Sequence, residues 1–218
     1  GSQGILAVSG GGSLQDNGLT VVAGGNGTVA VSGGSITSAG FGVSIGSTGS
    51  ALMTVTNGTV TAGGIGVANN SGYSGTLSIQ AGGVVHDTGN GTTIGGGGNG
   101  TLTINGGTLT SAGFGQLGGF SNTATGIATV TGGGLWTTAQ GLTIGNSGSG
   151  TLTVAGGTVT TNGIGIGSNG GSNGLLAIQA GGTVSDTGNY TILGSNGGGV
   201  GTVTVAGSGA LLHSNAFT

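Results

Sequence analysis

Lysine, arginine, proline, cysteine and glutamate are all absent from this 218-residue chain, whose only charged residues are three aspartates. A chain without lysine or arginine has no permanently positive side chain to pair with phosphate groups. We therefore expect no nucleic-acid partner and no binding to anionic lipid headgroups. Without cysteine, neither a disulfide framework nor a thiolate metal site can form. No apolar run approaches the roughly 18–20 residues of a transmembrane helix, so we expect no membrane insertion of this segment.

Glycine supplies 62 of the 218 residues, a content typical of flexible spacers. Against a spacer, 33% of the residues are hydrophobic and they recur in register. The phrase GTLTVAGG returns with small variations every 23 to 27 residues, and the repeats start near residues 4, 27, 51, 75, 100, 126, 150, 174 and 201. A period of this size predicts a solenoid rather than a disordered chain.

Each repeat contains three short stretches in which apolar and polar residues alternate, as in the repeat that spans residues 150–173. Its first stretch directs Leu152 and Val154 to one face, its second directs Val159 inward, and its third directs Ile164 and Ile166 inward. Alternation of this kind indicates half-buried strands, and the glycine and asparagine clusters between the stretches indicate tight turns.

The same three inward columns can be followed through the other repeats. The predicted inward pairs of the first strands are Leu6/Val8, Val29/Val31, Met53/Val55, Leu77/Ile79, Leu102/Ile104, Ala128/Val130, Leu152/Val154, Leu176/Ile178 and Val203/Val205. Those of the second strands are Leu14, Ile36, Val60, Val85, Leu109, Leu135, Val159 and Val184. Those of the third strands are Leu19/Val21, Phe41/Val43/Ile45, Ile65/Val67, Ile94, Phe114/Leu117, Leu142/Ile144, Ile164/Ile166 and Ile192.

These columns predict an all-β, single-stranded parallel β-helix in which residues 1–218 form one repeat domain of eight to nine rungs, with three short strands per rung. Helices are a poor alternative, because glycine costs about 1 kcal/mol at each helical position and no glycine-free stretch is long enough. No basic and apolar leader precedes the first repeat, and the last repeat breaks off at Thr218. We therefore expect the chain to be a fragment of a longer β-solenoid.

Whether the chain could be an enzyme depends first on its three carboxylates. These are Asp16, Asp87 and Asp186, which occupy the same corner of rungs one, four and eight. Rungs lie about 4.8 Å apart, so neighbouring carboxylates would be about 14 and 19 Å apart. Glycoside hydrolysis needs a pair about 5–9.5 Å apart. We expect each aspartate to bond its own turn backbone instead. His86 and Asp87 are adjacent and would face opposite sides of a strand. The sequence thus predicts no enzyme, no cofactor and no metal.

Two kinds of outward residue are candidates for surface contact. Threonine pairs on the second strands, such as Thr108/Thr110 and Thr158/Thr160, are typical of solenoid faces that bind ice, although Gln15, His86 and Trp136 would interrupt the columns. Trp136 is predicted to project outward beside Leu135, where it could stack on a sugar or a protein. The candidate contact residues are therefore Trp136, His86, Thr108, Thr110, Thr158 and Thr160.

Residues 128–163, ATVTGGGLWTTAQGLTIGNSGSGTLTVAGGTVTTNG, resemble the two-rung repeats of bacterial autotransporter passenger domains. The matching phrases are TVTGGGLW, LTIGNSGSG and GTLTVAGGTVT, and related phrases recur at 76–83, 100–110 and 202–212. The resemblance implies a right-handed parallel β-helix that is extracellular or on the bacterial outer surface. It also implies a role in adhesion, aggregation, biofilm formation or spacing. Residues 1–218 themselves contain no segment that resembles the β-barrel, autochaperone or protease parts of such proteins.

Three functions follow as hypotheses. The first is a structural stalk or adhesin segment of a surface or secreted protein, without catalysis. An alternative is a fibre subunit that stacks end to end through open rung edges, which carry no charged residues to block pairing. A minor alternative is an ice- or glycan-binding face. The expected partners are accordingly the chain itself, through end-to-end or lateral association, or a host or cell-surface glycan or protein.

Overall fold

The computed structural model describes residues 2–21, 24–188 and 190–218, and these residues form 26 β-strands in three parallel sheets and no helix. Sheet A contains β1 (Ser2–Ser9), β4 (Gly25–Ser32), β7 (Ser50–Thr56), β10 (Ser74–Ile79), β13 (Asn99–Asn105), β16 (Thr125–Thr131), β19 (Ser149–Ala155), β22 (Asn173–Ile178) and β25 (Val200–Val205). Sheet B contains β2 (Ser13–Asp16), β5 (Ser35–Ser38), β8 (Thr59–Ala62), β11 (Val84–Asp87), β14 (Thr108–Ser111), β17 (Leu135–Thr138), β20 (Thr158–Thr161), β23 (Thr183–Asp186) and β26 (Leu211–Ser214). Sheet C contains β3 (Leu19–Val21), β6 (Val43–Ile45), β9 (Ile65–Val67), β12 (Gly91–Ile94), β15 (Phe114–Leu117), β18 (Gly141–Ile144), β21 (Ile164–Ile166) and β24 (Thr191–Leu193).

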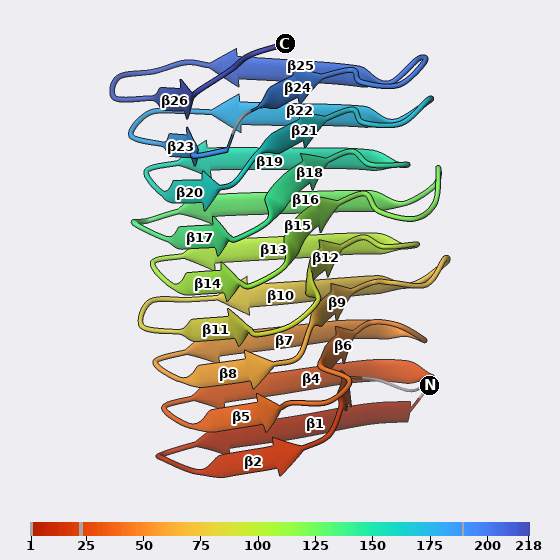
Figure 1. Cartoon of the computed structure of the whole chain (residues 1–218). Coiled ribbons are helices and arrows are strands. Elements are labelled where there is room, and N and C mark those ends of the chain that lie inside the picture. Colours follow the sequence, from red (N-terminus) through yellow and green to blue (C-terminus); the bar gives the residue numbers. More distant parts are fainter. Residues whose placement is uncertain (1, 22–23, 189) are drawn as a thin grey trace.

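The strands stack as a solenoid of about nine turns, and each strand pairs with the equivalent strand one turn away (Figure 1). The predicted parallel β-helix with three strands per rung is therefore confirmed. In sheet A, the nine repeat starts lie opposite one another in a single column, from Gly4 paired with Gly27 to Gly174 paired with Gly201. Eight steps of about 4.8 Å give the stack a length of about 40 Å.

The core is a continuous column of hydrophobic side chains, most of them aliphatic, that runs through the middle of the stack. The predicted inward residues of the first strands are buried in all rungs except the terminal ones. There Leu6 and Val203 are half-buried and Val205 is exposed. Interior residues of one rung thus obtain much of their burial from the rungs above and below, which is why a single rung could not fold alone.

Trp136 is the largest correction to the predicted interior. The side chain is fully buried and takes the inward place in β17, paired with Leu109 and Val159, whereas Leu135 is half-buried on the outer side. The prediction that Trp136 projects outward beside an inward Leu135 is wrong. The corner before β17 contains one more glycine than the corner before β14. A shift of one residue exchanges the two faces of a strand.

Three predicted inward residues of sheet C also lie elsewhere. Phe41 is exposed by 90%, because it lies in the corner before β6, and Phe114 is exposed by 58%, because it takes an outward place in β15, where Gly115 and Leu117 are the buried residues. In β24, Thr191 and Leu193 pair with Ile164 and Ile166, so Ile192 points to the outer side. The remaining aliphatic residues predicted for these strands are buried, apart from the half-buried Leu19 in the first rung.

Glycine is required at the corners by both backbone conformation and space. At Gly42, φ is +77°, and an added Cβ would lie 2.1 Å from the carbonyl oxygen of Gly64 in the next rung. At Gly95, φ is +67°, and an added Cβ would lie 2.0 Å from the carbonyl oxygen of Thr125. Only a residue without a side chain allows consecutive turns to approach this closely.

Candidate functional site

The three aspartates lie in one column at the corner between sheets B and C. Each ends the second strand of its rung, and the same column contains Ser38, Ser111 and other small polar residues. Asp87 and Asp186 are buried, which is unusual for carboxylates in a chain that has no lysine or arginine. A buried carboxylate is tolerated only when hydrogen bonds replace its hydration, so their partners decide their role.

Asp186 accepts hydrogen bonds from three groups. Its Oδ1 accepts from the amides of Gly188 (2.9 Å) and Gly163 (2.7 Å), and its Oδ2 accepts from the hydroxyl of Thr191 (2.8 Å). The Thr191 hydroxyl also meets Ser214 Oγ at 2.8 Å in the next rung. This carboxylate therefore ties together the second and third strands of its own rung and the rungs on both sides.

Asp87 repeats much of this arrangement four rungs earlier. Its Oδ1 accepts from the Gly89 amide at 3.1 Å, and its Oδ2 accepts from the Thr92 hydroxyl at 3.2 Å. Thr92 meets Ser111 Oγ of the next rung at 2.7 Å. The expectation that the aspartates bond their own turns is thus confirmed for Asp87 and Asp186. Asp16 differs, because its Oδ1 is buried without a hydrogen-bond partner among the described residues.

Five of the six predicted contact residues gather on the outer face of sheet B. His86, Thr110 and Thr160 belong to one outward column, and Thr108 and Thr158 belong to the column beside it. His86 Nδ1 lies 2.7 Å from Thr110 Oγ1, so these two side chains are in direct contact. The sixth residue, Trp136, is inside the solenoid, and Thr137 holds the outward place that was predicted for it.

The interior accommodates Trp136 through a glycine in sheet C. A Cβ added to Gly115 would lie 3.1 Å from Trp136 Cζ2, 2.8 Å from Leu142 Cδ1 and 2.9 Å from Thr138 Cγ2. The indole therefore occupies space that a side chain at position 115 would need. Its Nε1 is buried without a hydrogen-bond acceptor among the described residues. Buried inside the rod, Trp136 cannot serve as a contact residue.

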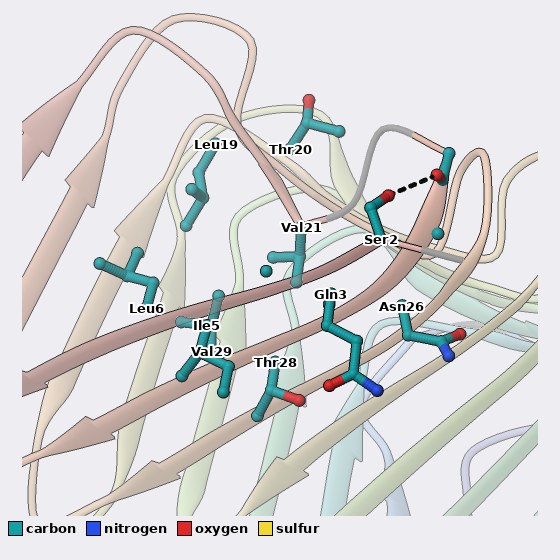
Figure 2. A pocket seen from close by; sticks show the side chains of 14 residues that line it. Ser2, Gln3, Ile5, Leu6, Leu19, Thr20, Val21, Asn26, Thr28 and Val29 are labelled. Carbon is teal, nitrogen blue, oxygen red and sulfur yellow. Dashed lines mark hydrogen bonds between the residues drawn. The ribbon is translucent and has the colours of Figure 1, made fainter.

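A hollow of about 370 Å³ opens at the first rung, where the interior of the solenoid meets solvent (Figure 2). Leu6, Leu19 and Val29 supply apolar walls, and Ser2 Oγ donates a hydrogen bond to the Gly24 carbonyl oxygen at 3.1 Å beside it. The hollow contains no charged side chain. Its position at the edge of β1 makes it part of an end surface rather than a separate site.

A second hollow lies on the outer face of sheet C and was not predicted. It measures about 170 Å³, and its lining includes Phe114 and Tyr190. Phe114 pairs with Gly91 and Gly141, and Tyr190 occupies the equivalent place beside Gly163. Most other rungs have glycine at this place, so two aromatic residues in a column of glycines were the sequence signal that could have identified it.

Comparisons with known proteins give no match: no family model, no curated protein and no solved structure is significantly similar to the chain. The described residues include no helix that is long and apolar enough to cross a bilayer. Within the same residues, no three histidine or aspartate side chains gather closely enough to hold a metal ion. The assignment of function therefore depends on the solenoid and its surfaces.

Proposed function

We propose that the chain is a structural segment of an extracellular protein, a stalk or adhesin rod on a bacterial surface. The observation that carries the proposal is the unbroken stack of rungs, in which buried polar side chains bond one rung to the next. The likeness of residues 128–163 to autotransporter passenger repeats supports the same role and an outer-surface location. We further propose that the chain has no catalytic activity, since Asp87 and Asp186 are engaged in holding turns.

A stalk must resist tension along its axis, and this can be measured by single-molecule pulling from the two termini. We expect a series of force peaks, each corresponding to the loss of one or a few rungs. One rung of roughly 24 residues extends by at most about 80 Å, which sets the spacing of the smallest events. Extension without force peaks would contradict a load-bearing role. Cleavage of a polysaccharide by the purified chain would contradict the absence of catalysis.

A second function, end-to-end assembly into fibres, is favoured by the two end surfaces. Among the described residues, the outer edges of β1 and β25 have no strand partner, and no charged side chain lies on either strand; the one carboxylate of the first rung, Asp16, ends the edge strand β2. Ile5 is exposed by 80% on β1, and Val200 and Leu211 are more than half exposed in the last rung. Open, uncharged edges of this kind are templates for pairing with another chain.

Electron microscopy across a concentration series tests this second function. Filaments with an axial repeat of about 4.8 Å are expected if copies continue each other's sheets. The matched variant Ile5→Lys/Leu211→Lys places a charge at each end and is expected to give discrete rods about 40 Å long. Discrete rods from the unmodified chain at every concentration would exclude fibre formation by this segment.

A further inference from the structure

We propose that the outer face of sheet C binds an uncharged glycan chain, with Phe114 and Tyr190 as its stacking platforms. The inference deepens the proposed function, on which it rests, because it gives an adhesin segment a ligand class and a site. The hollow beside both rings adjoins a second one of about 350 Å³, since Phe114 and Thr143 line both. The result is a groove that follows the solenoid axis along β12, β15, β18, β21 and β24.

The aromatic rings are available to a ligand. Phe114 is exposed by 58% and Tyr190 by 45%, although both border a hollow in which burial would be possible. The backbone positions of Phe114 and Tyr190 are three rungs apart in one column, which is about 14 Å along the stack. The Tyr190 ring lies over Gly163, since a Cβ added there would be 2.8 Å from Tyr190 Cζ. Exposed aromatic side chains grouped in a concave site mark interaction surfaces.

The floor between the rings is uncharged and combines polar side chains with glycines and the apolar Leu142 and Ile192. Gln140, Thr143, Ser168 and Ser195 line the groove, and their amide and hydroxyl groups can both donate and accept hydrogen bonds. Sugar hydroxyls have the same dual capacity. An anionic sugar would find no cation to pair with, because the sequence contains no lysine or arginine, and no aspartate lines the groove. The ligand that fits this lining is therefore neutral.

The regular spacing of the rungs along the groove favours an oligosaccharide over a peptide as the ligand. The rung spacing of about 4.8 Å is close to the advance of one pyranose unit, so successive units can meet equivalent positions on successive rungs. An extended peptide binds through backbone hydrogen bonds at a free sheet edge. This groove lies on the face of sheet C, where the backbones of β15, β18 and β21 are already paired on both sides.

The proposal is tested by isothermal titration of the whole chain with neutral hexasaccharides of glucose, mannose, xylose and N-acetylglucosamine, and with a hexasaccharide of galacturonic acid. We expect at least one neutral oligosaccharide to bind. Phe114→Ala and Tyr190→Ala are each expected to weaken that binding about tenfold, as the loss of one aromatic anchor does. Thr143→Val, which keeps the branched shape and removes the hydroxyl, is expected to weaken it several-fold.

Phe41→Ala is the matched control, because Phe41 is even more exposed at the same corner but lies outside the groove beside Phe114 and Tyr190. This variant is expected to bind as the unmodified chain does, and circular dichroism verifies that each variant is folded. Three results would overturn the proposal: no binding of any neutral oligosaccharide, equal loss in Phe41→Ala, or tighter binding of the galacturonic acid chain. None of these outcomes affects the pulling experiment, so the stalk role and the glycan site can fail separately.

Discussion

The inward position of Trp136 leads to a quantitative prediction for the variant Trp136→Ala. Truncation of a buried tryptophan costs about 3–5 kcal/mol of unfolding free energy. Gly115, which faces the indole, has no side chain that could refill the space. The variant also removes the buried Nε1–H, which has no acceptor among the residues that the structure describes, and this offsets about 1 kcal/mol or more of the cost. A net loss of roughly 2–4 kcal/mol is expected.

For a chain of this length, each kcal/mol shifts the melting temperature by about 2–4 °C, so Trp136→Ala should lower it by roughly 4–16 °C. The assay is thermal unfolding followed by circular dichroism. The matched control is Leu135→Ala in the same strand, on the outer side, for which we expect a loss below about 1 kcal/mol. Trp136 is the only tryptophan, so its fluorescence in the unmodified chain should also resist quenching by acrylamide.

The reasoning would be refuted by the opposite order of the two variants. If Leu135→Ala destabilised the chain more than Trp136→Ala, and acrylamide quenched the tryptophan readily, then Leu135 would be the inward residue. The extra glycine in the corner before β17 would in that case not change the register.

Three further predictions concern the interior and the corners. Gly115→Val should cost about 1–3 kcal/mol through overpacking, and in the background of Trp136→Leu, where the indole is gone, a double-mutant cycle should show that part of this cost disappears, while the closer contacts with Leu142 and Thr138 remain. Asp186→Ala leaves the buried amides of Gly163 and Gly188 without their carboxylate acceptor and should cost at least about 2 kcal/mol, whereas Asp186→Asn keeps an acceptor oxygen and should cost less; urea unfolding of both variants provides the comparison. Gly95→Ala should destabilise more than an alanine at an open glycine such as Gly197, because φ is +67° and Thr125 blocks the added Cβ; melting temperatures of the two variants distinguish this from a general effect of glycine loss.

The repeat of apolar columns was sufficient to predict the fold, because every rung buries its apolar side chains through the same alternation of inward and outward residues. The register of β17 could also have been predicted from the sequence, by comparing the number of residues in the corners between the first and second strands. Val130 and Trp136 are six positions apart, as are Ile79 and Val85, whereas Ile104 and Leu109 are five apart. Alignment with the six-position corners places Trp136 inside.

The groove on sheet C could not be predicted from alternation alone. Phe114 and Leu117 are three positions apart and cannot both point inward from one strand, which was a sign that one of them is exposed. That Phe114 and Tyr190 border one hollow depends on how the corners of four successive rungs stack. The length of each corner varies between repeats, and strand periodicity contains no information about it.

The polar column at the corner between sheets B and C affects which rungs pair with one another during folding. A chain of near-identical repeats can pair one whole rung out of place and still bury its apolar residues. A pairing error of two rungs, which brought Ala62 to the place of Ser111, would remove the hydroxyl that Thr92 meets at 2.7 Å, beside a buried carboxylate. Such a loss costs about 1–3 kcal/mol, which disfavours the slipped pairing by about 5- to 150-fold. The irregular placement of Asp87 and Asp186 thus gives otherwise equivalent repeats a fixed sequence of neighbours.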